Sequence, residues 1–345
     1  MISQRSLPTE TRRVWRLAFG AGFATLVSYA LMPDFAYLFV LLSVFIMLPP
    51  RPPPAFADLV KLLLVLVLST LWGMALGILL SWIPALGLLL FFVGMTITLR
   101  FGLARPEMGV VSMLFIVGQT IIAAISMRSA QLGLVMMLVM LSAFVFAFLV
   151  AWLSYVFLLR EDTVGEVQQP LPVTHTWVSL RAALVILPPF LAVLHDLFFI
   201  PLLIKGSFLA QQTNTKGAWQ QARELLLATL IGSVATVVLW NILSLWPNLL
   251  FLSLCIAFAV YVIAGYLYGA WKSRFDFAFW QNVLVTMLIL VGPAVQDPAF
   301  GNDVQQAMWI RIGLFFAVSL YTVLAVQLLD AVHGWTSRGR MFTTA

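Results

Sequence analysis

The sequence predicts an all-α protein that crosses a membrane about twelve times, since each crossing helix needs about 20 mainly apolar residues. Of the 345 residues, 62% are hydrophobic and 9% are charged, whereas a soluble domain carries about 25% charged residues. The apolar residues fall in long blocks such as 57–84 and 131–159. These blocks lack the polar–apolar alternation of an outer-membrane β-barrel. We therefore expect an α-helical, multi-pass membrane protein.

Each apolar block between short polar turns is interpreted as one span. The first follows a basic N-terminal segment without a small-residue cleavage site, so we interpret it as a retained helix rather than a signal peptide. The second and eighth blocks are short for a full crossing, and we expect them to be tilted, broken or re-entrant. The predicted spans cover residues 15–32, 35–49, 57–83, 85–101, 109–126, 131–159, 178–194, 197–211, 219–245, 248–270, 278–293 and 308–330.

The distribution of positive charge predicts the orientation of the chain. With the N-terminus inside, 16 of the 19 Lys and Arg residues fall in cytoplasmic loops or helix ends. Lys205 and Arg311 fall within spans, and only Arg128 lies in an outer loop. Because positive residues are retained in the cytoplasm, we expect both termini there and the chain in the bacterial inner membrane. The net charge of +6 then indicates this retention rather than a nucleic-acid partner.

Short sequence matches recur in the same order in the two halves of the chain, at offsets of 159 to 174 residues. Since each half would hold six spans, an even number, the copies would share one orientation. We therefore predict two parallel six-helix halves, 1–159 and 177–345, joined by a cytoplasmic linker at 160–176. The matches are Arg16-Leu-Ala-Phe and Arg181-Ala-Ala-Leu, Asp34 and Asp196, Thr70-Leu-Trp-Gly73 and Thr229-Leu-Ile-Gly232, Trp82-Ile-Pro84 and Trp246-Pro247, and Met113–Gly118 and Met287–Gly292.

Sequence signatures of enzymes are absent. The chain has no His-Glu-x-x-His, no Gly-x-Ser-x-Gly, no phosphate-binding loop and no glycine-rich dinucleotide loop. Its one cysteine, Cys255, lies in an apolar run, which excludes an intramolecular disulfide and a cysteine-based metal site. His175, His195 and His333 have no neighbour at ligand spacing. We expect no enzyme, no metal and no cofactor, so an ion gradient, the membrane potential or the substrate gradient would have to drive transport.

Lys205 is the most informative charged residue, because it lies near the middle of the short eighth span between Pro201 and Gly206. A charge at mid-membrane costs about 2.5–3.5 kcal/mol, so it usually faces a cavity or a partner. The alternative is that the span is shorter and Lys205 extends to the cytoplasmic face. Arg311 lies close to the outer end of the last span, where it either extends to the interface or offers a second cationic contact to an anion.

Four further charged residues are candidates. Asp34 and Asp196 stand at equivalent outer turns, where they are either solvated helix caps or a proton-linked pair near the exit. Arg223 and Glu224 open the ninth span on the inner side. They are either interfacial anchors or, in the functional interpretation, a substrate contact and a proton-linked acid.

Gly73 and Gly232 stand at matching places in the third and ninth spans. Membrane helices associate by close packing, and small residues let their backbones approach. We therefore predict that both glycines lie at helix contacts, with lipid-facing positions as the alternative. Leu at either position should disturb packing, and Ala should be much milder.

These segments resemble those of the fusaric acid resistance and aromatic acid exporter superfamily. The resemblance rests on an Arg opening each half and on Arg223-Glu-Leu-Leu-Leu-Ala-Thr-Leu-Ile-Gly232, which is similar to the family's basic, Thr and Gly pattern entering the third helix. Lys61 and Thr70-Leu-Trp-Gly73 occupy the corresponding region of the first half. The resemblance implies export of small aromatic or other organic acids beside a periplasmic adaptor protein and an outer-membrane channel. The chain lacks the large cytoplasmic domain of the larger members.

We therefore expect an inner-membrane exporter of small organic anions, surrounded by membrane lipid. A passive anion channel of the same architecture is the first alternative. The large facilitator class of transporters normally carries a Gly-rich charged motif between the second and third spans, where this chain has Pro49-Pro-Arg-Pro-Pro-Pro54. A lipid-modifying enzyme would need His, Asp or Ser clustered at a membrane face, and the sequence shows no such cluster.

Overall fold

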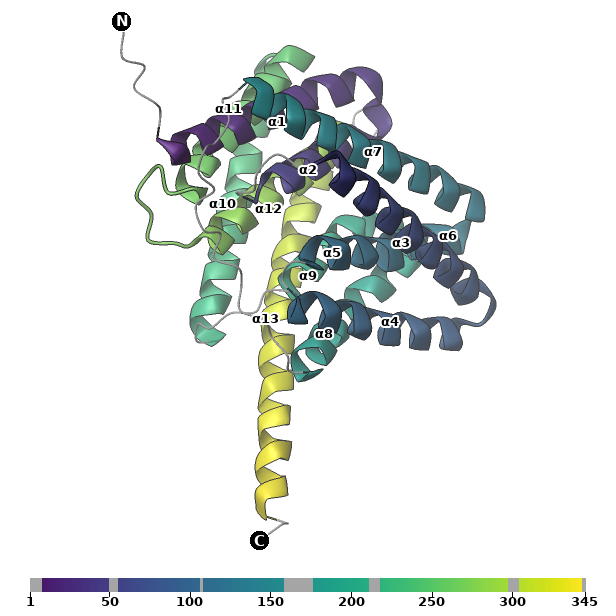
Figure 1. Cartoon of the computed structure of the whole chain (residues 1–345). Helices are drawn as coiled ribbons and strands as arrows, with labels where there is room; N and C mark the ends of the chain where they lie inside the picture. The colour runs from purple at the N-terminus through teal and green to yellow at the C-terminus, as the bar shows by residue number, and fades with distance from the viewer. Residues whose placement is uncertain are drawn as a thin grey trace, which may run out of the picture. The chain divides into compact units, whose positions relative to one another are not determined.

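The structure is a computed structural model (Figure 1) that describes residues 8–49, 55–105, 108–157, 176–210, 218–296 and 304–342. Every regular element in these ranges is helical, so the predicted all-α class is confirmed. Except for Thr176, the predicted linker 160–176 lies outside the described residues, as do Lys216 and the side chain of Pro201.

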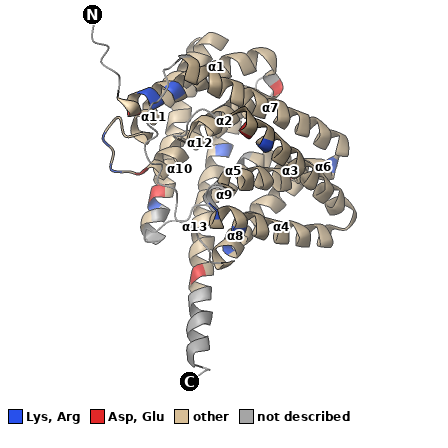
Figure 2. Cartoon of the chain, in the orientation of Figure 1, with Lys and Arg blue, Asp and Glu red and all other residues tan. Residues whose placement is uncertain are grey.

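Ten of the described helices are long and apolar enough to cross a membrane. Long stretches of their ribbon carry no charged residue (Figure 2), and the chain is therefore a multi-pass membrane protein. The ten are α1 (Thr9–Leu31), α3 (Phe56–Trp82), α4 (Pro84–Ala104), the continuous helix of α5 (Gly109–Val117), η3 (Gly118–Ile122) and α6 (Ala123–Arg128), α7 (Ala130–Phe157), α8 (Thr176–His195), α10 (Ala218–Leu245), α11 (Leu249–Leu267), α12 (Phe277–Gln296) and α13 (Val304–Phe342).

The two short blocks are also helical. They form α2 (Ala36–Met47, 12 residues) and α9 (Ile200–Ala210, 11 residues), each preceded by a short 3-10 turn, η1 (Pro33–Phe35) or η4 (Leu197–Phe199). Helices of this length extend only about 18 Å, against a hydrocarbon core of about 30 Å. Ten rather than twelve described helices therefore have crossing length.

Local signals explain several helix ends. Pro84 occupies the first turn of α4, where its missing N–H leaves no helical bond unmade. The Asn248 side chain caps α11 by accepting a hydrogen bond from the Leu250 N–H at 2.9 Å. Gly269 follows the last turn of α11 with φ +76°, a conformation that other residues rarely adopt. These residues fix where α4 begins and where α11 begins and ends.

The described helices belong to two compact units. Unit 1 is formed by described residues within Met1–Leu63, Leu138–Gln168 and Leu227–Ile312, and unit 2 by those within Leu64–Met137, Gln169–Leu226 and Gly313–Ala345. Unit 1 therefore contains α1, α2, α11 and α12, and unit 2 contains α3 from Leu64 on, α4 to α6, α8 and α9. Each unit takes helices from both halves of the sequence.

Unit 1 is built around α1, which packs along α11 (Figure 1) and against α2, while α12 packs on α2 and α11. Gly22 allows the close approach of α1 to α11, because an added Cβ there would lie 2.8 Å from the Ala257 Cβ. The Ser253 hydroxyl donates a hydrogen bond of 2.7 Å to the Gly22 carbonyl oxygen across the same contact. Small residues thus set the spacing of the two central helices.

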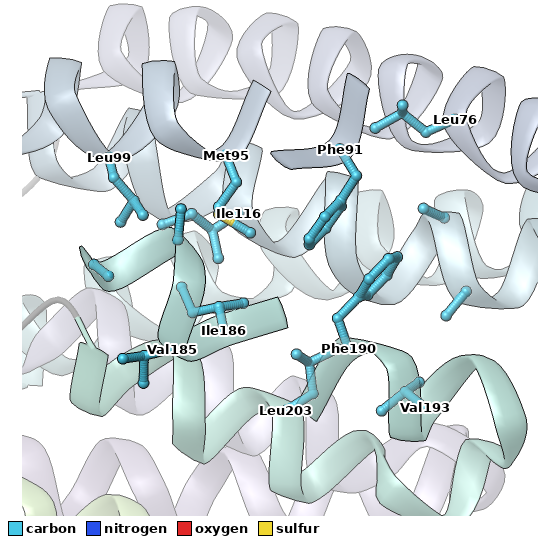
Figure 3. Packing of buried hydrophobic residues seen from close by; sticks show 14 of the residues in the cluster. Leu76, Phe91, Met95, Leu99, Ile116, Val185, Ile186, Phe190, Val193 and Leu203 are labelled. Carbon is cyan, nitrogen blue, oxygen red and sulfur yellow. The ribbon is translucent and has the colours of Figure 1, made fainter. Parts of the chain in front are cut away.

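Unit 2 is built around α8, which packs on α4 and α9, while α4 also packs on α5. Its apolar core is centred on Phe91 of α4 and Phe190 of α8, whose rings stack with centroids 3.8 Å apart (Figure 3). Both side chains are fully buried, and Leu76, Met95 and Ile186 belong to the same cluster.

Candidate functional site

Buried charge among the described residues is entirely positive. The buried charged side chains are Arg16, Lys205 and Arg311, which are 3%, 0% and 9% exposed. The described Asp and Glu side chains are exposed, except for Glu224, which is half-buried. An apolar interior strengthens the interaction of such cations with any anion that enters, because the local dielectric constant is low.

Lys205 lies on α9 in unit 2, and its fully buried side chain is enclosed by protein rather than extended along the surface. Beside it, Gly206 faces Pro189 of α8, where an added Cβ would lie 3.5 Å from the Pro189 Cγ. The proline at 189 cannot donate to the Val185 carbonyl one turn earlier, and the Tyr321 hydroxyl donates to that oxygen instead at 3.3 Å. Lys205 is thus followed by a residue that faces α8 where one backbone hydrogen bond of that helix is missing.

Arg311 lies near the start of α13 in unit 1 and is buried. Tyr37 of α2 lies near Arg311 within unit 1. Tyr37 packs against Gly292 of α12, where an added Cβ would overlap the Tyr37 Cβ. The Tyr29 hydroxyl also donates a long hydrogen bond of 3.4 Å to the Gly292 carbonyl oxygen of α12. One cation and two phenols are therefore grouped within unit 1.

The two tyrosines line a pocket that lies wholly within unit 1. Its cavity volume is about 20 Å³, which is room for about one water molecule. Helices α1, α2, α11 and α12 all contribute to it, through Thr25, Tyr29, Tyr37, Val40, Leu252, Ile256, Leu288, Val291 and Gly292. Three hydroxyl groups thus interrupt an otherwise apolar lining.

The other predicted charged residues lie closer to the surface. Asp34 is exposed in η1 of unit 1. Asp196 is exposed in unit 2, and its carboxylate caps η4 by accepting a hydrogen bond from the Phe198 N–H at 2.9 Å. Arg223 is exposed on α10, and Glu224 accepts a hydrogen bond from the Gln220 amide at 2.9 Å.

Gly73 and Gly232 are both buried at helix contacts. An added Cβ on Gly73 of α3 would overlap the Gly118 carbonyl oxygen of η3 within unit 2. An added Cβ on Gly232 of α10 would lie 2.8 Å from the Val283 carbonyl oxygen of α12 within unit 1. In each unit a glycine therefore lets two helix backbones touch.

The arginines that open the two halves have partners that the sequence did not indicate. The Arg16 guanidinium lies 4.1 Å from the centre of the Tyr155 ring in unit 1. In unit 2, Arg181 forms an ion pair with Asp330, and the Trp177 indole N–H donates to the same carboxylate at 2.9 Å. Each partner lies on α7 or α13, the last helix of its sequence half.

Sequence reasoning missed the pocket tyrosines and Gln119. Gln119 is fully buried in η3, a π-helical turn, and its amide nitrogen lies 3.5 Å from the Met95 sulfur. Its side-chain oxygen has no hydrogen-bond partner among the described residues. An amide side chain in an apolar span was a signal for Gln119 itself, although not for the turn around it. Tyr29 and Tyr37 were marked only by their positions on the two sides of the turn at Asp34.

Comparison with protein-family models, with curated proteins and with solved structures gives no match for this chain. The feature of the described residues that bears most directly on function is therefore the group of buried cations.

Proposed function

We propose that the protein exports small organic anions, aromatic carboxylates among them, across the bacterial inner membrane. The observation that carries this proposal is the sign of the buried charge. Among the described residues, the three buried charged side chains are all cationic, and no Asp or Glu is buried. Charged residues inside membrane segments usually line a path for substrate or ions, and cations favour an anionic substrate.

The membrane potential supports the outward direction. With an interior-negative potential, a monovalent anion gains about 2.3 kcal/mol per 100 mV on leaving the cell. This gain corresponds to an outward bias of roughly 50-fold, before any coupling to protons. Export then requires an anion-selective path, with no need for a nucleotide.

The contacts within each unit support an architecture of two six-helix repeats with about twelve crossings. In unit 1, α1 packs on α11 and α2, and in unit 2 their counterparts by sequence, α8, α4 and α9, pack in the same combination. The arginine contacts follow the same pattern. Arg16 contacts Tyr155 and Arg181 contacts Asp330, so in each half the first helix contacts the last.

Contacts between helix ends support a topology with both termini on one side of the membrane, which the positive charges assign to the cytoplasm. Each of four contacts joins two ends that the topology assigns to one side of the membrane. The outer contacts are Tyr29 with Gly292 and Arg128 with His195, and the inner contacts are Tyr268 with Leu48 and Arg181 with Asp330. If an odd number of membrane crossings lay between the two members of a pair, the two residues would lie on opposite sides of the membrane and could not touch. As the family resemblance implies, a periplasmic adaptor protein and an outer-membrane channel would complete the path.

A flux assay with Lys205 variants tests the proposed function. Full-length protein in vesicles would be loaded with benzenesulfonate, which stays ionised and cannot cross as a neutral acid, and a K⁺ diffusion potential would drive its exit. We expect Lys205→Met to lower the initial rate at least tenfold and Lys205→Arg to retain part of it. Lys272→Met is the matched control, because Lys272 is exposed in the turn after α11.

The controls separate the possible outcomes. Parental flux in Lys205→Met would remove Lys205 from the path. Wild-type flux no greater than that of protein-free vesicles would overturn anion export itself. Flux that saturates and responds to a pH gradient indicates a coupled exporter, whereas large single-channel currents indicate a passive channel.

A further inference from the structure

The first turns of α1 lie beside the last turns of α11 within unit 1. Gly22 of α1 faces Ala257 of α11. Seven residues earlier on α1, the Trp15 ring is centred 4.8 Å from the ring of Tyr261, which is four residues later on α11. The two helices therefore run antiparallel (Figure 1), and continuing the pairing by one turn places Arg12 beside the last turn of α11. In the proposed topology this is the cytoplasmic end of unit 1.

Aromatic rings continue from this contact onto the turn after α11. The Trp271 ring is centred 5.7 Å from the Tyr261 ring and 5.1 Å from the Tyr266 ring. The Trp271 N–H donates to the Gly265 carbonyl oxygen at 2.9 Å, and an added Cβ on Gly265 would lie 2.6 Å from the ring. Trp15 and Trp271 remain 47% and 37% exposed. Since Trp and Tyr concentrate where a membrane meets water, this cluster indicates the level of the lipid headgroups.

Arg12 carries an unpaired hydrogen-bond donor beside this cluster. It is three residues before Trp15 and four before Arg16, so it neighbours both on the surface of α1. Its Nε–H is buried and has no hydrogen-bond partner among the described residues. Leaving such a donor unpaired costs stability, and a guanidinium matches the geometry of phosphate oxygens. An anionic oxygen from a ligand would therefore complete this site.

The charge at this end of unit 1 is net positive. The first two turns of α1, Thr9–Arg16, contain three Arg and a single acid, Glu10. The first acid after α11 in the sequence, Asp276, caps α12 by accepting a hydrogen bond from the Phe279 N–H at 3.0 Å. Basic segments at the cytoplasmic surface attract the anionic lipids of that leaflet. The charge therefore favours an anionic headgroup over a zwitterionic one.

Exposed apolar side chains continue from the cluster toward the middle of both helices. Phe19, one turn after Trp15, is 38% exposed, and Phe258 and Leu254 of α11 are 70% and 68% exposed. In the antiparallel pairing of Trp15 with Tyr261, Phe19 and Phe258 stand within one residue of the same level. An acyl chain that extends from a headgroup at Arg12 would pass beside these side chains.

We infer that an anionic phospholipid binds at this end of α1 and α11, with its phosphate on Arg12 and an acyl chain along Phe19 and Phe258. The phosphate supplies the acceptor that the Arg12 Nε–H lacks, and Trp15 and Trp271 flank the headgroup. A water-soluble phosphate would match only the cationic part of the site. The inference does not depend on which molecule the protein transports.

Lipid binding to the full-length, detergent-purified protein tests the inference. Native mass spectrometry would compare dioleoyl phosphatidylglycerol with dioleoyl phosphatidylcholine, which has the same acyl chains. We expect the first phosphatidylglycerol to bind at least tenfold more tightly. Arg12→Gln should weaken its binding at least fivefold and leave phosphatidylcholine unchanged, and Arg12→Lys should retain part of the preference. Lys272→Gln is the matched control, because it removes the same charge from an exposed side chain next to Trp271, and it should change the affinity less than twofold.

Phe258→Ser tests the acyl-chain contact without altering any charge. Because the two lipids share their acyl chains, it should weaken the binding of both at least threefold. Leu89→Ser is its control, since Leu89 is 58% exposed on α4 in unit 2. Parental affinity in Phe258→Ser would overturn the inference, and this measurement decides even where Arg12→Gln does not purify.

Three further results would overturn the inference. Equal affinity of the wild type for the two lipids would show that the site does not select an anion. Equal losses in Arg12→Gln and Lys272→Gln would show a diffuse attraction to positive charge. Displacement of phosphatidylglycerol by equimolar soluble glycerophosphoglycerol or polyglutamate would assign the surface to a free phosphate or to an acidic protein segment.

Discussion

Arg16 and Arg181 hold equivalent positions in the two halves but interact with different chemical groups. Arg16 is buried and lies over the Tyr155 ring, whereas Asp330, the partner of Arg181, is exposed. A desolvated cation–π contact is worth about 2 kcal/mol, and an exposed ion pair about 0–1 kcal/mol. Burial rather than formal charge therefore decides which arginine contributes more to stability.

We predict that Arg16→Gln destabilises the protein more than Arg181→Gln. The first change should cost about 1–3 kcal/mol because a buried site loses its cation, and the second should cost less than about 1 kcal/mol. Thermal unfolding of the detergent-purified variants gives the order. A double-mutant cycle with Tyr155→Leu isolates the ring contact. A larger loss for Arg181→Gln would contradict the assignment.

At the scale of elements, α3 meets the helix that contains η3 through a row of small residues. Ser69, Gly73 and Gly77 are four residues apart and therefore share one face of α3. Each of the three contacts backbone or small side chains between Gly118 and Met127. The two helices are joined by backbone proximity, so there is no space at this contact for even one extra carbon.

We predict that Gly73→Ala lowers the thermal unfolding temperature by several degrees, because a loss of about 1 kcal/mol shifts it by roughly 2–4 °C in a chain above 150 residues. From the sequence alone we expected Ala to be much milder than Leu at Gly73 and Gly232. The structure adds that even Ala is too large at Gly73, where the new Cβ would overlap a backbone oxygen, and that Gly232→Ala should be less harmful.

Gly313→Ala is the control for this prediction. Gly313 is helical, and no atom lies within 4 Å of an added Cβ. The change should be neutral or slightly stabilising, because Ala favours a helix by about 1 kcal/mol over Gly. Equal unfolding temperatures for the Gly73 and Gly313 variants would show that the α3 contact accommodates an extra methyl group without loss of stability.

The helices were predictable from the sequence because hydropathy is a local property. Each predicted span coincides with a helix, and the larger differences are at the ends, since α1 begins at Thr9 and α13 continues to Phe342. Those extra turns are polar and carry no membrane signal. The π-helical turn η3 was not predictable, because Gly118 and Gln119 stand in a run that fits an ordinary α-helix.

The pocket could not be predicted for a different reason. A cavity results from the absence of side-chain volume at several helices together, and it depends on which helices pack. The sequence does not distinguish Thr25 from other residues of its apolar helix, because only the structure shows that Ile256 lies near it. Lys205 and Arg311 could be identified from the sequence because one charge in an apolar run is informative by itself.

At the scale of the whole molecule, the compact units do not follow the order of the chain. The first half supplies α1 and α2 to unit 1 and α4 to α6 to unit 2, and the second half supplies α11 and α12 to unit 1 and α8 and α9 to unit 2. The contact of α1 with α11 and that of α4 with α8 therefore join distant parts of the sequence. Neither half contains a complete unit.

We therefore predict that residues 1–159 and 177–345, expressed together as separate chains, associate and copurify. Each chain expressed alone should aggregate or be degraded, because the faces that α1 and α8 bury would lack their partners. Size-exclusion chromatography with both chains tagged separately measures the association. A half that purifies alone as a monodisperse, thermally cooperative species would contradict the shared composition of the units.

The shared composition has an evolutionary consequence. An ancestor with a single six-helix segment could form these units only by pairing two identical copies, each lending its first helices to the fourth helix of the other. Twofold symmetry would then make the two units identical. Every substitution would appear twice, so a Thr at position 25 would open both units and a Phe would close both. A single chain carrying both copies would be free of that constraint, since Thr25 and Phe190, 165 residues apart like Arg16 and Arg181, could change independently. Unit 1 could then keep its pocket while unit 2 keeps the stacked Phe91 and Phe190 rings.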